Sequence, residues 1–558
     1  MWWSLRHDSE STQKGGTAHK HALICPGGKP TCPLPAWALS ASLLPLSGPQ
    51  YTVVYKFGGS SVRDAERMRE VANIVCSFPE HLPCVVLSAM GKTTNNLLAA
   101  GEEAMTCKST EVEQLPHLLM VRELHERTCA ELGLPPADTA EVAALLQQLT
   151  QLLTGISLMQ EVTSRTSANL VSFGERLATR IFASYLRTQG VAARQWDSFG
   201  RLGFVSSDDF SNGDILPETY AVAGAVLADP IGSPSRPEVA VVTGFLAKGQ
   251  KSGAITTLGR GGSDLTATVL GRALGVSEVQ VWKDVDGVLT ADPRIAADAV
   301  PVPFLTYEEA TELAYFGAQV LHPLAMQPAI SSERDLNVRV KNSYNMAAPG
   351  TLITRHRDMS SSLLTSVVRK QNVSMLDIVS TRMLGQHGFL AQVFAVMAAH
   401  QVSVDVVATS EVSVSVTLDP AKLWSKPGVE SGLARLQEEL GRIATVSIAP
   451  EHAVLSLICN VRRSNEILER VFRALGAAGI SVKMISQGAS RCNISILVDG
   501  ACCQCRPGGG PNRLELTASP PSFLGAVADL AVRQLHDEFF PSGTKSAQQA
   551  AQPAAAAR

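Results

Sequence analysis

Strand-like and helix-like patterns of hydrophobic residues alternate between residues 52 and 343. Short apolar runs bounded by turn residues predict buried strands at residues 52–57, 84–91, 238–245, 278–285 and 337–343. Apolar residues at helical spacing predict helices at residues 61–75, 115–132, 141–153, 169–190 and 263–275, and one that begins near Thr306 with Glu309 in capping-box position. Because strands and helices alternate, this region is predicted to be α/β, a mostly parallel sheet between helices.

The pattern changes after residue 360, where one unit occurs twice. Residues 388–419 resemble residues 465–499, and Val402-Ser403-Val404 of the first copy corresponds to Ile480-Ser481-Val482 of the second. Each copy reads as helix, strand, turn, strand, which predicts two small α+β modules of one kind. Because such modules expose sheet edges or helix faces that can pair, a ligand site at their interface is plausible.

The composition narrows the class of protein without identifying it. The chain has 558 residues, 45% of them hydrophobic and 18% charged, which fits a soluble protein of three or four domains. A formal net charge of −3 argues against a non-specific nucleic-acid binder. The sequence has no apolar run of about 18 residues, so we expect no membrane-spanning helix.

The cysteines and the two ends suggest where the protein works. Eleven scattered cysteines, an odd number, favour a reducing compartment over a disulfide scaffold. Cys502, Cys503 and Cys505 lie in a Gly- and Pro-rich stretch that we interpret as a loop, and no protein-bound metal is predicted. Residues 1–50 are basic and serine-rich, which favours a targeting leader.

The first motif with candidate chemistry follows the first predicted strand. Lys56 is succeeded by Gly58, Gly59 and Ser60. Glycines at a strand end let backbone N–H groups approach phosphate oxygens, and a lysine there could neutralise them. Taken alone, the pair of glycines is more typical of a tight turn with a surface lysine.

A second motif, Thr257 to Asp264, opens the helix at residues 263–275. Three glycines surround Arg260, whose guanidinium group suits a carboxylate or a phosphate. Ser263 or Asp264 could simply cap the helix, but a cap does not need three glycines, so a binding function is favoured.

Two weaker motifs complete the set. Lys283 and Asp284 lie at the carboxyl end of a predicted strand, where open α/β sheets bind ligands, and they suit a nucleotide with Mg²⁺. A polar turn is a fair alternative. Glu175 and Arg176 lie in a helical segment and alone would indicate a solvated face.

Taken together and in this order, these motifs resemble those of aspartate kinases, members of the amino acid kinase family. The resemblance rests on KFGGSSV, SFGER, TTLGRGGSD, VWKDVDGV and AYFGAQVLHP, and TSVVRKQNVSMLDIVSTRMLGQHGFLAQVF is similar to the monofunctional, lysine-sensitive plant-type enzymes. It implies phosphorylation of the β-carboxylate of L-aspartate by ATP with Mg²⁺, which gives 4-phospho-L-aspartate and ADP. This reaction is the first step towards lysine, threonine, methionine and isoleucine.

The resemblance also implies a role for individual residues. A carboxylate is already an ionised nucleophile, so the reaction needs positioning and charge neutralisation rather than a general base. Lys56 and Asp264 are the expected catalytic residues. The expected ATP contacts are Lys56, Gly58, Gly59, Ser60, Lys283, Asp284, Leu289 and Arg294. The expected aspartate contacts are Ser88, Thr94, Glu175, Arg260 and Ser263.

The repeated modules resemble ACT domains, which are ferredoxin-like amino-acid sensors that pair across subunits. Lysine is the inhibitor that this implies, S-adenosylmethionine is a possible second effector, and a homodimer or larger homo-oligomer is expected. The implied effector contacts are Met383, Gln386, Gly388, Phe389, Leu390, Ser403, Val404 and Asp405. The second copy has Lys483 in place of Asp405 and Glu466 in place of Gly388, so it is expected to lack this site.

We expect the chain to divide at the following boundaries. Residues 1–50 are the leader, 51–360 the kinase domain, 361–452 the first ACT domain, 453–540 the second, and 541–558 a disordered tail. Residues 501–524 interrupt the second copy and are either a surface loop or a gene-model artefact. The plant-type resemblance and the leader together predict a chloroplast location.

Two other functions remain as alternatives. One is another amino acid kinase, acting on glutamate or acetylglutamate, which the ACT pair and the combination of SFGER with GRGGSD oppose. The other is a catalytically inactive amino-acid sensor, which the presence of Lys56, Glu175, Arg260 and Asp264 opposes.

Overall fold

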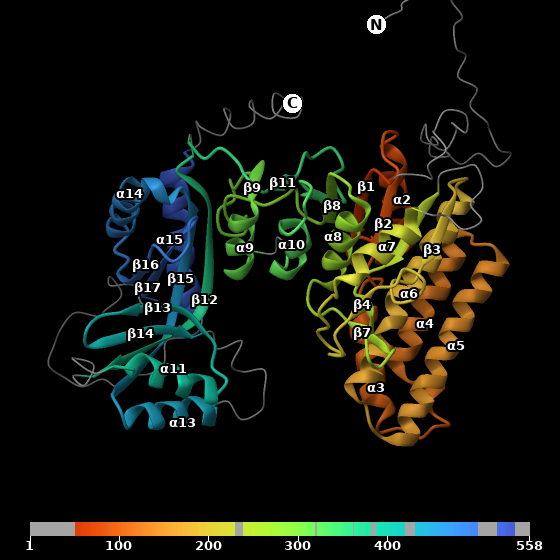
Figure 1. The fold of residues 1–558 in the computed structure, drawn as a ribbon, viewed down its shortest axis with the longest axis horizontal. Coiled ribbons are helices and arrows are strands. Elements are labelled where there is room, and N and C mark those ends of the chain that lie inside the picture. Colours follow the sequence, from red (N-terminus) through yellow and green to blue (C-terminus); the bar gives the residue numbers. More distant parts are fainter. Residues whose placement is uncertain are drawn as a thin grey trace, which may run out of the picture.

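The computed structural model forms two parts, each built on its own sheet (Figure 1). It describes residues 51–228, 238–318, 321–360, 362–380, 387–418, 430–499 and 522–541. The predicted leader and most of the predicted insert and tail lie outside these residues. The insert was predicted to extend to residue 524, but the last helix already begins at Ser522.

The first part contains an eight-stranded sheet in the order β3-β5-β2-β1-β8-β10-β11-β9. Every neighbouring pair is parallel except β10 with β11, which confirms the predicted mostly parallel sheet. The strands are β1 (Val53–Phe57), β2 (Pro83–Leu87), β3 (Ala193–Trp196), β5 (Val239–Thr243), β8 (Glu278–Lys283), β9 (Phe304–Thr306), β10 (Asn337–Asn342) and β11 (Thr351–Thr354).

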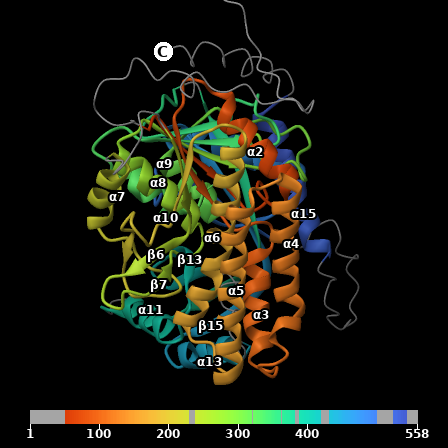
Figure 2. The ribbon, with the colours of Figure 1, turned by 90° about the vertical axis from the view of Figure 1, so that its right-hand side faces the viewer.

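Helices cover both faces of this sheet because alternate strand residues are apolar on both sides. Tyr55 and Trp282 face one core and Val54 and Val281 the other. The first face carries α2 (Ala65–Ser77), η1 (Val112–Gln114), α3 (Thr93–Ala104), α4 (Pro116–Leu132), α5 (Pro136–Met159) and α6 (Ser164–Thr188), and Figure 2 shows α3 to α6 as one layer. The second carries α7 (Glu218–Ala228), α8 (Gly262–Leu274), α9 (Tyr307–Tyr315) and α10 (Pro323–Ile330). A small sheet joins β4 (Val205–Ser206), β6 (Leu246–Gly249) and β7 (Ile255–Thr257).

Helix α5 is the one described helix that is long and apolar enough to cross a membrane, with a mean hydropathy of 1.3 over its best window. Its Leu145, Leu149 and Leu153 are buried in the core shared with α3, α4 and α6. That packing is typical of the core helix of a globular domain.

Capping residues and glycines explain most of the boundaries of the helices and strands. Two predicted boundaries are corrected. The capping box at Thr306 and Glu309 is present as predicted, and Gly275 ends α8 with φ at 65°. The helix predicted from residue 61 instead begins at Ala65, because the Asp64 side chain accepts a hydrogen bond from the Arg67 N–H and caps it there. The strand predicted at 84–91 ends at Leu87, and the chain then turns into the candidate site.

The second part is one six-stranded antiparallel sheet in the order β13-β14-β12-β15-β17-β16. Its strands are β12 (Leu364–Val379), β13 (Val404–Thr409), β14 (Ser413–Leu418), β15 (Thr445–Cys459), β16 (Val482–Ser486) and β17 (Asn493–Asp499). Its helices are α11 (Phe389–Ala399), α13 (Glu430–Gly441), η3 (Val461–Arg463), α14 (Ser464–Ala477) and α15 (Ser522–Phe539).

The long central strands β12 and β15 each contribute one half to the first copy and the other half to the second. Residues 375–379 of β12 pair with 445–449 of β15 in the first copy, which also holds β13 and β14. Residues 364–370 pair with 454–459 in the second copy, which also holds β16 and β17. The second copy therefore completes its four-stranded sheet with residues 364–370, which lie before the predicted division at residue 452. The strands of the first copy, residues 375–449, come between these and the rest of the second copy in the chain.

Candidate active site

The carboxyl ends of β1, β2 and β8 meet at one edge of the parallel sheet and carry the predicted motifs. Lys56 is in β1, Ser88 follows β2, and Lys283 ends β8. Helix α8 starts at the same edge, so its N-terminal turn contributes Ser263 and Asp264. This is where open α/β sheets bind ligands, because successive loops converge there.

A buried ion pair lies at the centre of the site. Lys56 Nζ is 2.5 Å from Asp264 Oδ1, and the two residues are 8% and 6% exposed. Burial alone would raise the pKa of the Asp264 carboxyl, but Lys56 and Lys283 outweigh that effect and lower its pKa. Burial lowers the pKa of the Lys283 ammonium, which Asp264 partly opposes. One carboxylate thus organises two lysines that face the same space.

The loop after β1 needs glycine because another backbone comes close to it. A Cβ at Gly59 would lie 2.7 Å from the Ala89 carbonyl oxygen, and the Gly91 N–H donates to the Gly59 oxygen at 3.0 Å. The Ser61 N–H donates to the Gly58 oxygen at 3.0 Å and closes a tight turn, with Ser60 exposed at its tip. The turn is tight, but Lys56 is buried and not on the surface, and the binding of phosphates by this loop stays a prediction.

The second glycine run shapes the start of α8. Gly261 has φ at 73°, and a Cβ there would collide with His322. The helix N-terminus, a favourable place for anionic groups, lies beside the Lys56–Asp264 pair, because Asp264 is in its first turn. The Ser88 hydroxyl donates to the Ser263 hydroxyl at 3.0 Å, which joins the β2 and α8 loops, and Arg260 is exposed just before the helix.

Glu175 is a buried carboxyl in α6 that points to the loop after β2. The residue is 3% exposed, and its Oε1 accepts a hydrogen bond from the Ala89 N–H at 3.1 Å. No described group bonds to Oε2. Burial raises the pKa of Glu175 to about 8, and the Ala89 N–H only partly opposes this. The adjacent Gly174 permits this approach, because a Cβ there would lie 2.6 Å from the Ala89 Cβ. A cationic ligand group would stabilise the ionised carboxylate.

The other predicted aspartate and ATP contacts differ in burial and in their hydrogen-bond partners. Thr94 is half-buried in the first turn of α3, and Asp284 is exposed after β8. The Leu289 oxygen accepts a hydrogen bond from Ser366 of β12 at 2.9 Å. The Arg294 side chain is 88% exposed and pairs with Asp292 at 2.7 Å. The roles of Leu289 and Arg294 in nucleotide binding stay predictions.

The predicted effector positions lie on two elements of the first copy. Gly388, with φ at 89°, precedes α11, where Phe389 is buried and Leu390 is 40% exposed. Ser403 and Val404 open β13. Met383 and Gln386 lie outside the described residues.

Asp405, the predicted partner of an effector ammonium group, is bound within the chain. Its side chain is 2% exposed and forms an ion pair with Lys370 of β12. Tyr315, at the end of α9, donates its hydroxyl proton to Asp405 Oδ1 at 2.7 Å. The motifs did not identify Lys370 or Tyr315, because only the fold brings these residues to Asp405.

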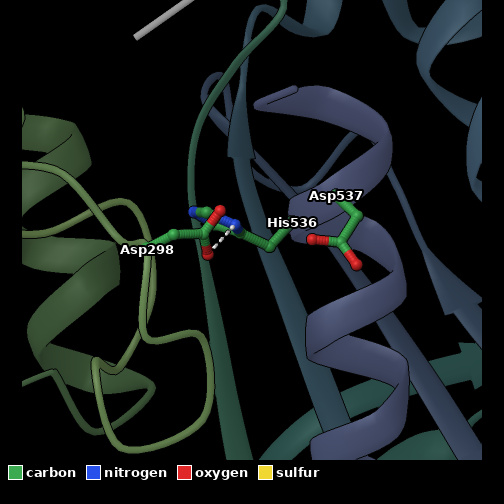
Figure 3. A group of neighbouring side chains, drawn as sticks. All are labelled: Asp298, His536 and Asp537. Atoms are coloured by element: carbon green, nitrogen blue, oxygen red, sulfur yellow. Dashed lines mark ion pairs between the residues drawn. The ribbon is translucent and has the colours of Figure 1, made fainter. Parts of the chain in front are cut away.

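A histidine joins the last helix to the first part (Figure 3). His536 of α15 is fully buried; its Nε2 lies 2.9 Å from the Thr290 hydroxyl and its Nδ1 3.4 Å from Asp298 Oδ1. Asp298, His536 and Asp537 form a group whose possible metal-ligand atoms lie within 4.8 Å of one another. Because His536 already contacts Thr290 and Asp298, we interpret the group as a tie between the two parts.

A cavity of about 560 Å³ lies where α9 begins and β15 ends. Its lining includes Thr306, Glu309, Arg357, Asn460 and Arg491. None of the predicted ATP or aspartate contacts lines it, so it is separate from the candidate active site.

Comparison with known proteins agrees with this geometry. The amino acid kinase family model matches residues 51–342, and an ACT domain model matches residues 456–504. Aspartokinase 1, chloroplastic, of Arabidopsis thaliana is 54% identical over 496 residues, which cover 89% of this chain and 81% of that protein. Aspartokinase 2, chloroplastic, of the same plant is 57% identical over 456 residues, which cover 81% of this chain and 82% of that protein.

Solved structures give the same result. Escherichia coli aspartokinase III in complex with aspartate and ADP superposes with a TM-score of 0.68 at 32% identity, covering 88% of this chain and 99% of that one. The same enzyme with lysine and aspartate gives a TM-score of 0.67 at 31% identity, with the same coverage. These matches confirm the predicted fold class, an α/β amino acid kinase domain followed by α+β ACT domains. The chain belongs to the aspartokinases of the amino acid kinase family.

Proposed function

We propose that this chain transfers the γ-phosphoryl group of ATP to the β-carboxylate of L-aspartate, giving 4-phospho-L-aspartate and ADP. The observation that carries the proposal is the placement of Glu175, a buried carboxyl with an uncommitted oxygen, on the sheet edge that holds Lys56 and Lys283. One side of the site suits an ammonium group and the other suits phosphates. Two plant relatives named aspartokinase share more than half of the aligned residues.

The chemistry follows from the charges in the site. Lys56 and Lys283 would neutralise the transferring phosphoryl group. The glycine turn after β1 would hold the other phosphates of ATP through backbone N–H groups. Asp264 keeps both lysines in place. Because the aspartate β-carboxylate attacks as an anion, its position decides the rate.

The substrate would be held by groups from three elements. Glu175 would bind the ammonium group, and Arg260 the α-carboxylate, leaving the β-carboxylate directed at the phosphates. Ser88, Ser263 and Thr94 would complete these contacts. Mg²⁺, which binds through phosphates and few protein carboxylates, would supply further charge neutralisation, and Asp284 is the exposed carboxylate nearest in sequence to Lys283.

Regulation by lysine is the second element of the proposal. Escherichia coli aspartokinase III has been solved with lysine, and another relative is named lysine-sensitive aspartokinase 3. We place the effector at residues 383–390 and 403–405 of the first copy, with Asp405 binding an ammonium group. S-adenosylmethionine is a second candidate effector, and pairing of ACT modules between subunits would give a homodimer or larger assembly.

The pathway and location follow from the same family membership. The reaction opens the synthesis of lysine, threonine, methionine and isoleucine. Three relatives with 54% to 57% identity are named chloroplastic, which supports a plastid location for this chain.

A coupled assay of ADP formation tests the activity. We expect turnover with aspartate but not with glutamate or N-acetylglutamate, and inhibition by lysine when lysine, threonine and S-adenosylmethionine are added separately. Lys56→Ala should abolish turnover. If another acid replaced aspartate, the substrate assignment would be wrong, and turnover unaffected by Lys56→Ala would refute the role of Lys56.

A further inference from the structure

The end of β10 and the three residues after it, 342–345, lie against both loops of the predicted nucleotide site. Strand β10 is the neighbour of β8, and β8 is the neighbour of β1. Asn342 aligns with Lys283 in the pairing of β10 with β8. The segment therefore leaves the sheet at the same edge as the site.

Its contacts to the glycine loop run through Ser343. The Ser343 hydroxyl lies 3.0 Å from the Ser61 hydroxyl, which ends the turn after β1. Arg67 of α2 donates from Nη2 to the Ser343 oxygen at 3.1 Å and to its hydroxyl at 3.0 Å. The Arg67 guanidinium also lies 3.5 Å from the centre of the Tyr344 ring, and Arg67 is 3% exposed.

Its contacts to the loop after β8 involve backbone and side chains. The Ser343 N–H donates to the Lys283 oxygen at 2.7 Å. Asn342 and Asn345 both donate side-chain N–H groups to Asp286 Oδ1, at 2.8 and 3.1 Å. The Tyr344 N–H donates to the Asn342 side-chain oxygen at 2.9 Å, which holds that amide in orientation.

We propose that residues 342–345 and Arg67 form a brace that sets the spacing between the two nucleotide loops, the one at residues 58–61 and the one at 283–286. Arg67 and Ser343 are positioning residues, since they act on the ligand through Ser61 and Lys283. The inference rests on the proposed nucleotide site, and it gives a role to Arg67 and Ser343, to which the motifs assigned none.

The burial of Arg67 supports a specific role. Its one described carboxylate partner is Glu70, on the same helix, and its other contacts are Ser343 and an aromatic ring. A buried cation is costly when much of its coordination is neutral. A brace needs this geometry, because the planar guanidinium reaches a carbonyl, a hydroxyl and a ring face at once.

The test compares the effect of each variant on the KM for ATP with its effect on the KM for aspartate. Ser343→Ala and Arg67→Lys are introduced into the full chain, with Arg339→Met as the matched control. Arg339 is also in β10, but it pairs with Glu278 at the opposite edge of the sheet. We expect both brace variants to raise the KM for ATP by about tenfold and to lower kcat, with the KM for aspartate changed less than twofold. The control should leave both KM values unchanged.

Direct binding keeps this test independent of the proposed reaction. Calorimetric titration of the full chain with ADP should show the same tenfold weakening in both brace variants, whether or not aspartate is the substrate. Asp286→Asn, which weakens the brace from the other loop, should do the same. Equal changes for ATP and aspartate, or unchanged ADP affinity in variants that unfold at the wild-type temperature, would overturn the proposal. Absence of aspartate-dependent turnover in the wild type would instead count against the proposed function.

Discussion

Replacing Glu175 by glutamine should stabilise the folded chain while it abolishes aspartate binding. The substitution keeps the shape of the side chain and the acceptor for the Ala89 N–H, and it removes only the ionisable group. Burial raises the pKa of Glu175 from 4.5 to about 8, so folding opposes its ionisation. That cost is absent below pH 4.5, grows as the pH rises towards 8, and is constant above.

The magnitude follows from the pKa in the two states. Each pH unit between 4.5 and 8 adds about 1.4 kcal/mol, so the cost is about 3 kcal/mol at pH 7 and about 5 kcal/mol above pH 8. Glu175→Gln should remove it. At about 2 °C for each kcal/mol, the midpoint of thermal unfolding should rise by about 6 °C at pH 7 and by little at pH 5.

Two assays check the reasoning. Thermal unfolding of the wild type and of Glu175→Gln is followed from pH 5 to pH 9, with the exposed Glu102→Gln on α3 as the control. Calorimetry then measures aspartate binding at pH 7 in buffers with different ionisation enthalpies. Because the ammonium group requires ionised Glu175, the wild type should release about 0.9 proton for each aspartate bound.

The stability prediction and the binding prediction are refuted by different results. A difference in unfolding temperature that does not change with pH would show that Glu175 is not held neutral in the free site. Aspartate binding that survives in Glu175→Gln, or that releases no proton in the wild type, would remove Glu175 from the ammonium site.

Three further changes test other parts of the structure. Gly59→Ala places a Cβ 2.7 Å from the Ala89 oxygen and should raise the KM for ATP at least about tenfold; an unchanged KM in the ADP assay would contradict the close approach. Asp264→Asn removes the counter-charge of Lys56 and should lower kcat about 100-fold or more; a kcat near wild type in single-turnover measurements would exclude this role. Asp405→Ala should relieve lysine inhibition and spare basal activity, whereas Lys483→Ala, its match in the second copy, should leave lysine inhibition intact; equal behaviour of the two variants in lysine titrations would displace the effector site.

The sequence predicted the parts of this molecule that depend on local pattern. Strand β1 is apolar except at Lys56, and the capping box at Thr306 uses residues three apart, so both could be predicted from the order of residues. The glycine runs and Asp264 gave the centre of the site because close approach and charge restrict which residues can serve there. Helix α2 was placed four residues early, because the side-chain bond at Asp64 was not considered.

Other features depend on contacts between distant residues and could not be predicted this way. The use of residues 364–370 by the second copy leaves no trace in the repeat pattern, because the repeated units begin only at residues 388 and 465. Asp405 meets Tyr315 across 90 residues, and Ser343 meets Ser61 across 282. Glu175 appeared to be a solvated helix residue because only the packing of α6 against the loop after β2 buries it.

Helix α9 packs against the antiparallel sheet of the second part, and its contacts are regularly spaced. Glu309 accepts hydrogen bonds from Thr365 and Arg357, Glu312 accepts one from Asn493 of β17, and Tyr315 donates one to Asp405 of β13. Residues three apart share one face of a helix, so the sheet contacts a single stripe along α9.

The segment after this stripe reaches the catalytic pair. His322 packs against Gly261, the residue that precedes α8 and its Asp264. A ligand whose ammonium group takes Asp405 must replace Lys370 and Tyr315 there, and Tyr315 is the last residue of α9. Loss of that contact would remove a hydrogen bond at the end of the helix nearest to His322, where Phe316 also packs against Val406 of the sheet, while Glu309 and Glu312 hold the other end. If the effector site and the active site are where we propose, they would be linked through one helix held at both ends by different strands, which is the kind of element that two sites can bias.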